Sequence, residues 1–226
     1  MDTIDRNAGS RQRASGPKGQ AQGLTEEQFQ KLRHFALTDC NVPHSVELKL
    51  LLSFRAGLRA AEISTLRISQ SLLDAEGKIG PSIRISAKNS KGGRERIIPM
   101  HPEIRDALKR LRRAHPNIDF VAFSGRWRHI KHQSTPALTN WFHRLYRDAG
   151  FLGCSSHSGR RTFITTLARV ANQFNNSLRD VQRIAGHARL ETTECYIDPS
   201  LDVSALVSSL GRAPRPQPIR SGAWCA

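Results

Sequence analysis

The chain has 226 residues, of which 35 are Lys or Arg and 19 are Asp or Glu, so its formal net charge is +16. This length suits one domain with a real core, and no stretch is apolar enough to cross a bilayer or to act as a signal peptide. The four cysteines are scattered without CxxC spacing, which argues against a secreted disulfide scaffold and favours a reducing, cytoplasmic compartment. A positive excess of this size indicates a polyanionic partner, most commonly nucleic acid.

The first part of the chain predicts a helical domain that begins after a polar tail. Residues 1–23 contain hardly any apolar side chains and no periodicity, so we expect a flexible basic tail. Order is expected from Leu24, where Thr25 and Gln28 form a capping box ahead of apolar residues at helical spacing. A leucine-rich, buried helix is predicted over 45–56.

A change of period in the middle of the chain predicts a β-hairpin. Isoleucines alternate with polar residues over 82–99, on either side of a glycine-containing turn. A helix with a basic outer face is expected over 103–113. The segment 120–123 fits either a short strand or a buried loop.

The later elements are helices, which apolar spacing and capping signals predict at 136–148, 157–171 and 177–185, with a further helical start at Thr192. Residues 211–226 contain three prolines and are expected to form a second flexible tail. The predicted fold is therefore mainly α with a small antiparallel β-sheet (α+β), in one domain over 24–210.

A polar segment follows the leucine-rich helix, where the chain reads GLRAAE from Gly57 to Glu62. Arg59 comes after a glycine break at the head of a short helix, where its guanidinium and free backbone N–H groups can bind a phosphate. Glu62 lies within reach to orient it. Taken alone, this segment favours an ordinary surface ion pair.

The tip of the hairpin reads KGGRER from Lys91 to Arg96. Glycine lets the backbone approach a ligand closely, and a lysine on a mobile tip can reach a phosphate. Lys88 is the rival for this role. A solvated basic turn explains the tip equally well.

Two histidine-containing segments lie further along the chain. His157 and Arg160 are spaced i, i+3, so both can address one phosphate from one helical face, with Arg161 behind them. A histidine that caps the helix is the alternative. His187 comes just beyond a helix stop, and Tyr196 follows nine positions later, where a core tyrosine is commoner than a catalytic one.

The combination of these side chains supplies the parts of a metal-free phosphodiester transesterification. Arginines neutralise the charge that grows on the non-bridging oxygens. A tyrosine hydroxyl can attack phosphorus covalently, and a lysine or histidine can protonate the leaving 5′ oxygen. No carboxylate cluster in the sequence suggests a pair of magnesium ions, which argues against a two-metal nuclease.

In this order and spacing, the four segments resemble the tyrosine recombinase (phage integrase) family. GLRAAEISTLR is similar to its first box, SKGGRERIIPM to its lysine hairpin, HSGRRTFIT to its second box and AGHARLETTECYI to its nucleophile box. The likeness covers about 24–200. The site that it implies consists of the nucleophile Tyr196, the catalytic residues Arg59, Lys91, His157, Arg160 and His187, and the supporting Glu62. Basic neighbours that we expect to contact DNA are Arg94, Arg96 and Arg161.

The resemblance implies a site-specific DNA recombinase (integrase) that cuts and rejoins double-stranded DNA through a 3′-phosphotyrosyl intermediate. It implies a homo-tetramer on DNA in the bacterial cytoplasm, with Lys91 as the favoured general acid and with no cofactor, metal or membrane. Gly159 and Ala185 stand where the family usually has leucine, and Arg161 where histidine is frequent. The tail 1–23 is too short for the separate helical core-binding domain that most members carry.

Other functions stay open. A decayed, recombinase-derived protein would bind DNA without nicking it, and a type IB topoisomerase would use the same chemistry to relax supercoils without pairing two sites. A metal site is a weak rival: His129 and His132 are spaced i, i+3 and Cys154 lies near His157, but no further ligand follows a zinc pattern.

An apolar stripe follows the tyrosine, at Leu201, Val203, Leu206, Val207 and Leu210. Packing on its own domain and docking on a neighbouring protomer explain the stripe about equally well.

Overall fold

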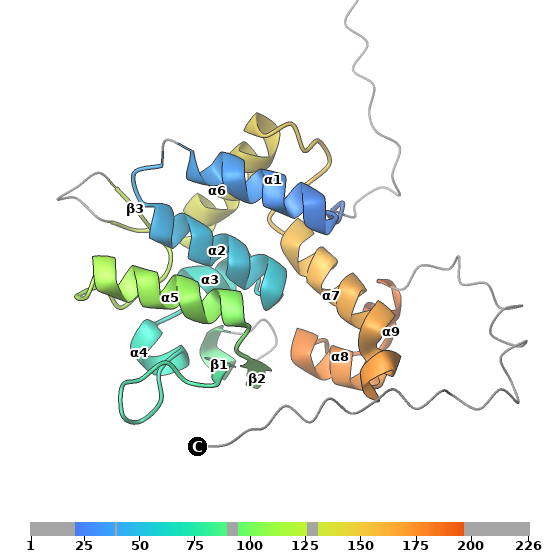
Figure 1. The fold of residues 1–226 in the computed structure, drawn as a ribbon. Helices are drawn as coiled ribbons and strands as arrows, with labels where there is room; N and C mark the ends of the chain where they lie inside the picture. Colours follow the sequence, from blue (N-terminus) through green and yellow to red (C-terminus); the bar gives the residue numbers. More distant parts are fainter. Residues whose placement is uncertain (1–20, 39, 90–94, 126–130, 197–226) are drawn as a thin grey trace, which may run out of the picture.

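The computed structural model describes residues 21–38, 40–89, 95–125 and 131–196 (Figure 1). Its α-helices are α1 (Glu26–Leu37), α2 (Pro43–Arg55), α3 (Ala60–Thr65), α4 (Ile68–Ser71), α5 (Pro102–Ala114), α6 (Thr135–Asp148), α7 (Ser158–Val170), α8 (Leu178–Ala185) and α9 (Glu191–Glu194). Its strands and 3-10 helices are β1 (Ser82–Ile85), η1 (Ala87–Asn89), β2 (Arg96–Pro99), β3 (Phe123–Ser124), β4 (Lys131–His132) and η2 (Ala171–Phe174). The predicted fold class, mainly helical with a small antiparallel sheet, is confirmed.

Helix α2 forms the centre of the core. Every residue from Ser45 to Phe54 is buried, and α1, α5 and α7 pack around the helix (Figure 1). The helix begins at Pro43, two residues before the predicted start, because the fixed φ of proline suits a first helical turn. Its burial on all sides explains why its leucines follow no single stripe.

Capping interactions fix the ends of two helices as predicted. At the start of α1 the Thr25 hydroxyl accepts a hydrogen bond from the Gln28 N–H, and the Gln28 side chain accepts one from the Thr25 N–H. Ser177 and Asp180 repeat this box at α8. Gly186 then ends α8 in the left-handed conformation, with φ 67°.

The predicted hairpin is confirmed as an antiparallel pair of strands. Strands β1 and β2 place Ile83 opposite Ile98, and both side chains are buried. A second two-stranded sheet pairs β3 with β4, with Phe123 opposite His132. The segment 120–123, open between strand and loop on sequence grounds, therefore ends in a strand.

Helix α7 joins the main core to a smaller apolar cluster at one end of the domain (Figure 1). It packs against both α2 and α8. The small cluster contains Ile164, Val181 and Ala185, and Tyr196 packs against it. The C-terminal motifs are therefore held beside the turn between α2 and α3.

The ends of the described chain differ slightly from the expected boundaries. The described residues already contact the domain at Gln22, whose N–H donates to the carbonyl of Gly153 at 3.2 Å, so the last residues of the expected tail lie against the body. Helix α9 ends at Glu194, and Ile197 lies outside the described residues, as do most of both predicted tails. None of the described helices is long and apolar enough to span a membrane.

Candidate active site

The turn between α2 and α3 sets the position of Arg59. Gly57 has φ 63°, and a Cβ at this position would lie 2.3 Å from the ring of Phe163 on α7, so only glycine fits. Arg59 is the N-cap of α3, and its N–H donates to Glu62 Oε2 at 2.8 Å. Its Nη1 also donates to Glu62 Oε1 at 3.0 Å. Glu62 therefore orients Arg59, as the sequence suggests.

Glu62 is itself fixed by a second arginine. Both terminal nitrogens of Arg96 donate to its carboxylate, at 2.9 and 2.8 Å. Burial opposes ionisation of Glu62, but the hydrogen bonds and charges of Arg96 and Arg59 outweigh it and hold the pKa of Glu62 below its ordinary value. Arg96, which the sequence predicts to contact DNA, is only 7% exposed. Its guanidinium instead binds Glu62 inside the protein.

Arg160 links the turn before Arg59 to the end of α8. It lies in the first turn of α7 and is 3% exposed. Its Nη1 donates to the carbonyl of Gly57 at 2.7 Å, and its Nη2 donates to the carbonyl of Ala185 at 2.6 Å. Burial, followed by the charge of Arg59, lowers the pKa of Arg160 to about 10, so it stays cationic at neutral pH.

Close packing of α7 on α2 explains the unusual Gly159. A Cβ there would lie 2.3 Å from Ser53 Oγ and 2.8 Å from the ring of Phe54. The two helices therefore approach each other through this glycine. Arg160, the next residue, is thereby brought close to the turn that carries Arg59.

His187 follows the left-handed Gly186 and is 7% exposed. Its Nδ1 shares a hydrogen bond with the hydroxyl of Thr193 at 2.9 Å, and its ring stacks on Tyr196 with centroids 5.6 Å apart. Burial, followed by the charges of nearby arginines, lowers the pKa of His187 to about 4. These arginines are Arg160, Arg59 and Arg96. At neutral pH the imidazole is uncharged.

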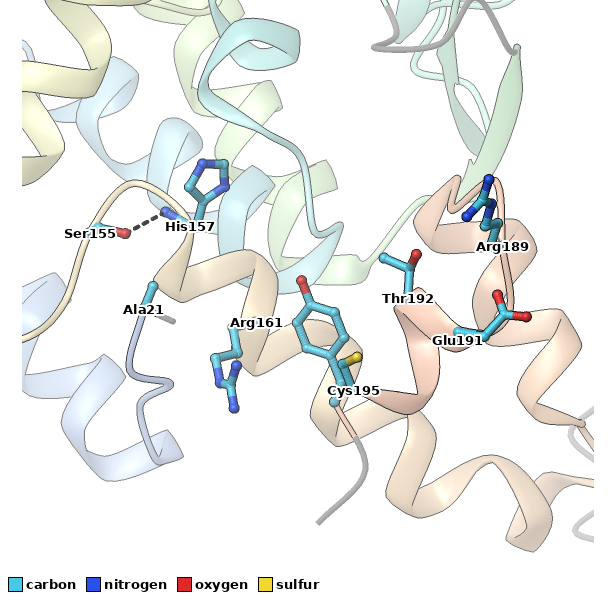
Figure 2. A pocket seen from close by; sticks show the side chains of 9 residues that line it. Ala21, Ser155, His157, Arg161, Arg189, Glu191, Thr192 and Cys195 are labelled. Atoms are coloured by element: carbon cyan, nitrogen blue, oxygen red, sulfur yellow. Dashed lines mark hydrogen bonds between the residues drawn. The ribbon is translucent and has the colours of Figure 1, made fainter. Parts of the chain in front are cut away.

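A cavity of about 690 Å³ opens beside Tyr196. Figure 2 shows that side chains from the start of α7, including His157 and Arg161, line it, together with Thr192 and Cys195 from the α9 segment. The Arg161 guanidinium lies 5.6 Å from the centre of the Tyr196 ring. The cavity therefore brings the Arg161 guanidinium, the His157 side chain and the Tyr196 phenol to one space.

Comparisons with known proteins identify the family of the chain. Residues 22–201 match the model of the phage integrase family. The chain belongs to this family.

Relatives of the chain include tyrosine recombinases. Over 182 residues it is 26% identical to the tyrosine recombinase XerA of Pyrococcus horikoshii, and the match covers 80% of this chain and 58% of that relative. The Tn1549 transposon integrase in complex with circular intermediate DNA has a similar fold, with a TM-score of 0.62, 20% identity and coverage of 86% of this chain and 67% of that one. The catalytic domain of bacteriophage HP1 integrase matches over its whole length and 87% of this chain, with a TM-score of 0.52 and 17% identity.

Five of the six expected catalytic residues lie within the described part of the chain: Arg59, His157, Arg160, His187 and Tyr196. His157 occupies the N-cap position of α7, yet its side chain makes no capping hydrogen bond, so the capping alternative does not describe it. Lys91 and Arg94 lie outside the described residues, and their roles stay predictions. The rival Lys88 is exposed on η1.

The side chains considered for a metal site do not gather in the described part of the integrase domain. His132 Nε2 contacts the carbonyl of Ser64 at 2.6 Å, and His129 lies outside the described residues. Among residues 21–38, 40–89, 95–125 and 131–196, no three His, Cys, Asp or Glu side chains form a group that could hold a metal ion.

Sequence reasoning gave no role to Thr193 and assigned Arg96 to DNA. Thr193 is fully buried and holds His187, but their six-residue separation across a turn follows no helical or strand period. The inward role of Arg96 was also missed. The signal for it was available: Ile98 is two positions away and faces the core, and strand alternation places Arg96 on the same face.

Proposed function

We propose that this chain acts as a site-specific DNA recombinase that cuts and rejoins double-stranded DNA through a 3′-phosphotyrosyl intermediate. The observation that carries the proposal is that Arg160 on α7 joins three motif segments through its hydrogen bonds. Arg160 binds the turn before Arg59 and the end of α8 before His187, and His187 stacks on Tyr196. These contacts bring a buried cation, a neutral imidazole and a phenol together.

The proposed reaction exchanges one phosphodiester for another. The Tyr196 hydroxyl gives up its proton as its oxygen forms a bond to the scissile phosphorus, while the bond from phosphorus to the 5′ oxygen breaks. Arg59 and Arg160 stabilise the charge on the non-bridging oxygens. Lys91 is the favoured donor of a proton to the leaving 5′ oxygen, and His157 and His187 support proton transfer and oxygen contacts. The 5′ hydroxyl of a partner strand then reverses the step, so no ATP is needed.

The expected partner is double-stranded DNA, and the assembly on it is a homo-tetramer. The net charge of +16 favours DNA binding, and the structurally similar Tn1549 integrase is bound to DNA. We place the catalytic domain at 24–210 and the reaction in the cytoplasm. Because the relatives include an archaeal XerA, the likeness does not favour a bacterial over an archaeal source.

The proposal is tested by trapping the intermediate on nicked suicide substrates that carry the DNA ends flanking the coding region, in the presence of a chelator. Wild type and Tyr146→Phe should form a covalent complex, and Tyr196→Phe should form none. Tyr146 is the matched control because it is the other tyrosine of the chain, and its buried hydroxyl has no hydrogen-bond partner among the described residues.

Two other results would point elsewhere. Tight, salt-dependent binding without any trapping would identify the decayed, non-catalytic DNA-binding protein instead. Trapping together with relaxation of supercoiled DNA that lacks a second site would indicate type IB topoisomerase activity.

A further inference from the structure

We infer that Arg96 is a positioning residue of the proposed recombination site, which fixes Arg59 through Glu62 and supports the turn that presents His187. The inference rests on the proposed function, since the reaction is what makes the orientation of Arg59 matter. It gives the first residue of β2 a role inside the protein in place of the DNA contact expected from the sequence.

The carboxylate of Glu62 is shared between two arginines in a fixed pattern. Oε1 accepts from Nη1 of Arg59 at 3.0 Å and from Nη1 of Arg96 at 2.9 Å. Oε2 accepts from the backbone N–H of Arg59 and from Nη2 of Arg96, both at 2.8 Å. Each oxygen therefore has one partner from each arginine, so rotation of the carboxylate would break bonds to both.

Burial separates the roles of the two arginines. The side chains of Glu62 and Arg96 are 1% and 5% exposed, whereas that of Arg59 is 19% exposed. Arg59 is therefore the member that a phosphate can reach, and Arg96 lies behind it. Without Arg96, a buried carboxylate would keep a single cationic partner and would lose the bidentate contact that sets its plane.

Arg96 also touches the segment that carries His187. A Cβ on Gly186 would lie 3.0 Å from Cδ of Arg96, and φ at this glycine is 67°. The arginine stem thus fills the space beneath the turn before His187. One side chain contacts both the segment of Arg59 and the segment of His187, which are far apart in sequence.

The arrangement is costly as a means of stability alone. Within the described residues, the buried Nε of Arg96 has no hydrogen-bond partner, and a buried ion pair contributes little net stability compared with apolar residues of the same volume. The ion pair of Arg96 and Glu62 is better explained by its orientation of Arg59 than by a contribution to stability.

The test compares Arg96→Lys and Arg96→Met with Arg84→Met, which removes an exposed arginine from the neighbouring strand β1. Single-turnover cleavage at saturating DNA and the DNA dissociation constant are measured separately. Both Arg96 variants should cleave about 100-fold more slowly, because neither side chain can make the two-pronged contact. Their DNA affinity should stay within about twofold of wild type, as should both values for Arg84→Met.

A substrate with a methylphosphonate at the scissile position distinguishes positioning from general damage. Its phosphorus carries no negative oxygen charge, so Arg59 has less to stabilise. The Arg96→Lys defect should shrink to about threefold on this substrate, and a defect that persisted would overturn the inference. Weakened DNA affinity with a normal cleavage rate would also overturn it, in favour of the direct DNA contact.

A readout without cleavage separates this inference from the proposed function. Within the described part of the chain, the charged and titratable groups that face His187 are Arg160 on α7, Arg59 before α3, Arg96 on β2 and the stacked Tyr196. In an NMR titration of the free protein, Arg96→Met should raise the pKa of His187 and Arg96→Lys should not. An unchanged pKa in Arg96→Met would contradict the placement of Arg96, even if wild type proved unable to cleave DNA.

Discussion

At the scale of single residues, the site is built from groups whose protonation is set by burial. His187 is neutral because its burial, followed by the charges of nearby arginines, lowers its pKa to about 4. Arg160 stays charged although buried, because both of its terminal nitrogens have carbonyl partners. A fixed cation beside a neutral imidazole suits a reaction that builds negative charge on a phosphate.

The depressed pKa of His187 predicts a stability effect in acid. Its pKa falls from 6.5 to about 4 on folding, so between these values the unfolded chain binds more protons and stability decreases as the pH falls. His187→Gln should reduce this loss by about 1 kcal/mol when denaturant unfolding is compared at pH 7 and pH 5. The exposed His143→Gln on α6 is the control. An equal acid loss in both variants would contradict the assignment.

The buried Lys49 predicts how the stability of the fold changes above neutral pH. It is 1% exposed on α2, its Nζ donates to Gln133 at 2.7 Å, and it lies 4.2 Å from the Trp141 ring centre. Burial lowers its pKa from 10.5 to about 7, so the unfolded chain binds more protons between these values and stability rises with pH. Lys49→Met should remove that rise.

The same substitution should stabilise the protein at pH 7 by about 1 kcal/mol, because it removes the cost of burying an ammonium group. Urea denaturation at pH 7 and pH 9.5, with the exposed Lys109→Met on α5 as the control, checks both statements. Lower stability of Lys49→Met at pH 7 would refute them.

At the scale of elements, the close approach of α7 to α2 decides where the motifs meet. The contact passes through Gly159, whose missing Cβ leaves room for Ser53 and Phe54. Because Arg160 follows directly, any separation of the helices moves its guanidinium away from the carbonyl of Gly57.

Gly159→Ala should therefore destabilise the domain by about 2 kcal/mol and slow cleavage more than it weakens DNA binding. Ser53→Ala should restore part of the loss, because Ser53 Oγ is the atom that the new Cβ meets first. Gly80→Ala, where the nearest atom lies 3.6 Å away, is the control. Thermal unfolding is compared for wild type, Gly159→Ala, the double variant Gly159→Ala with Ser53→Ala, and Gly80→Ala. If Ser53→Ala restores no stability to Gly159→Ala, this packing is contradicted.

Local signals in the sequence predicted the helices and strands well, but they predicted the contacts between distant elements poorly. The capping boxes at Thr25 and Ser177 and the stop at Gly186 are short-range features, and all are confirmed. The contact of Gly159 with Ser53 spans more than a hundred residues, so Gly159 could be recognised only as a departure from the family pattern. Arg96 was assigned to DNA because it belongs to a basic hairpin, although alternation with Ile98 pointed inward.

At the scale of the whole molecule, the proposed site would act on one phosphate, whereas recombination needs two duplexes cut and rejoined. The chain spans 58% of the length of the XerA relative. The apolar stripe over 201–210 lies outside the described residues, so its use stays a prediction.

Truncation after Ser200 should leave DNA binding within about twofold and abolish synapsis, with a lower cleavage rate. Electrophoretic separation of single-duplex and paired complexes measures both. Unfolding of the truncated protein would assign the stripe to its own core instead of to a neighbouring protomer.

The most direct measurement of the central claim identifies the covalent bond itself. After trapping, nuclease digestion and trypsin, the peptide 190–212 contains Tyr196 as its single tyrosine and should carry the mass of a nucleotide joined through its 3′ phosphate. The released strand should end in a free 5′ hydroxyl that a kinase can label directly. An adduct on another residue, a link to the 5′ end of the DNA, or bound DNA that never forms an adduct would contradict the account.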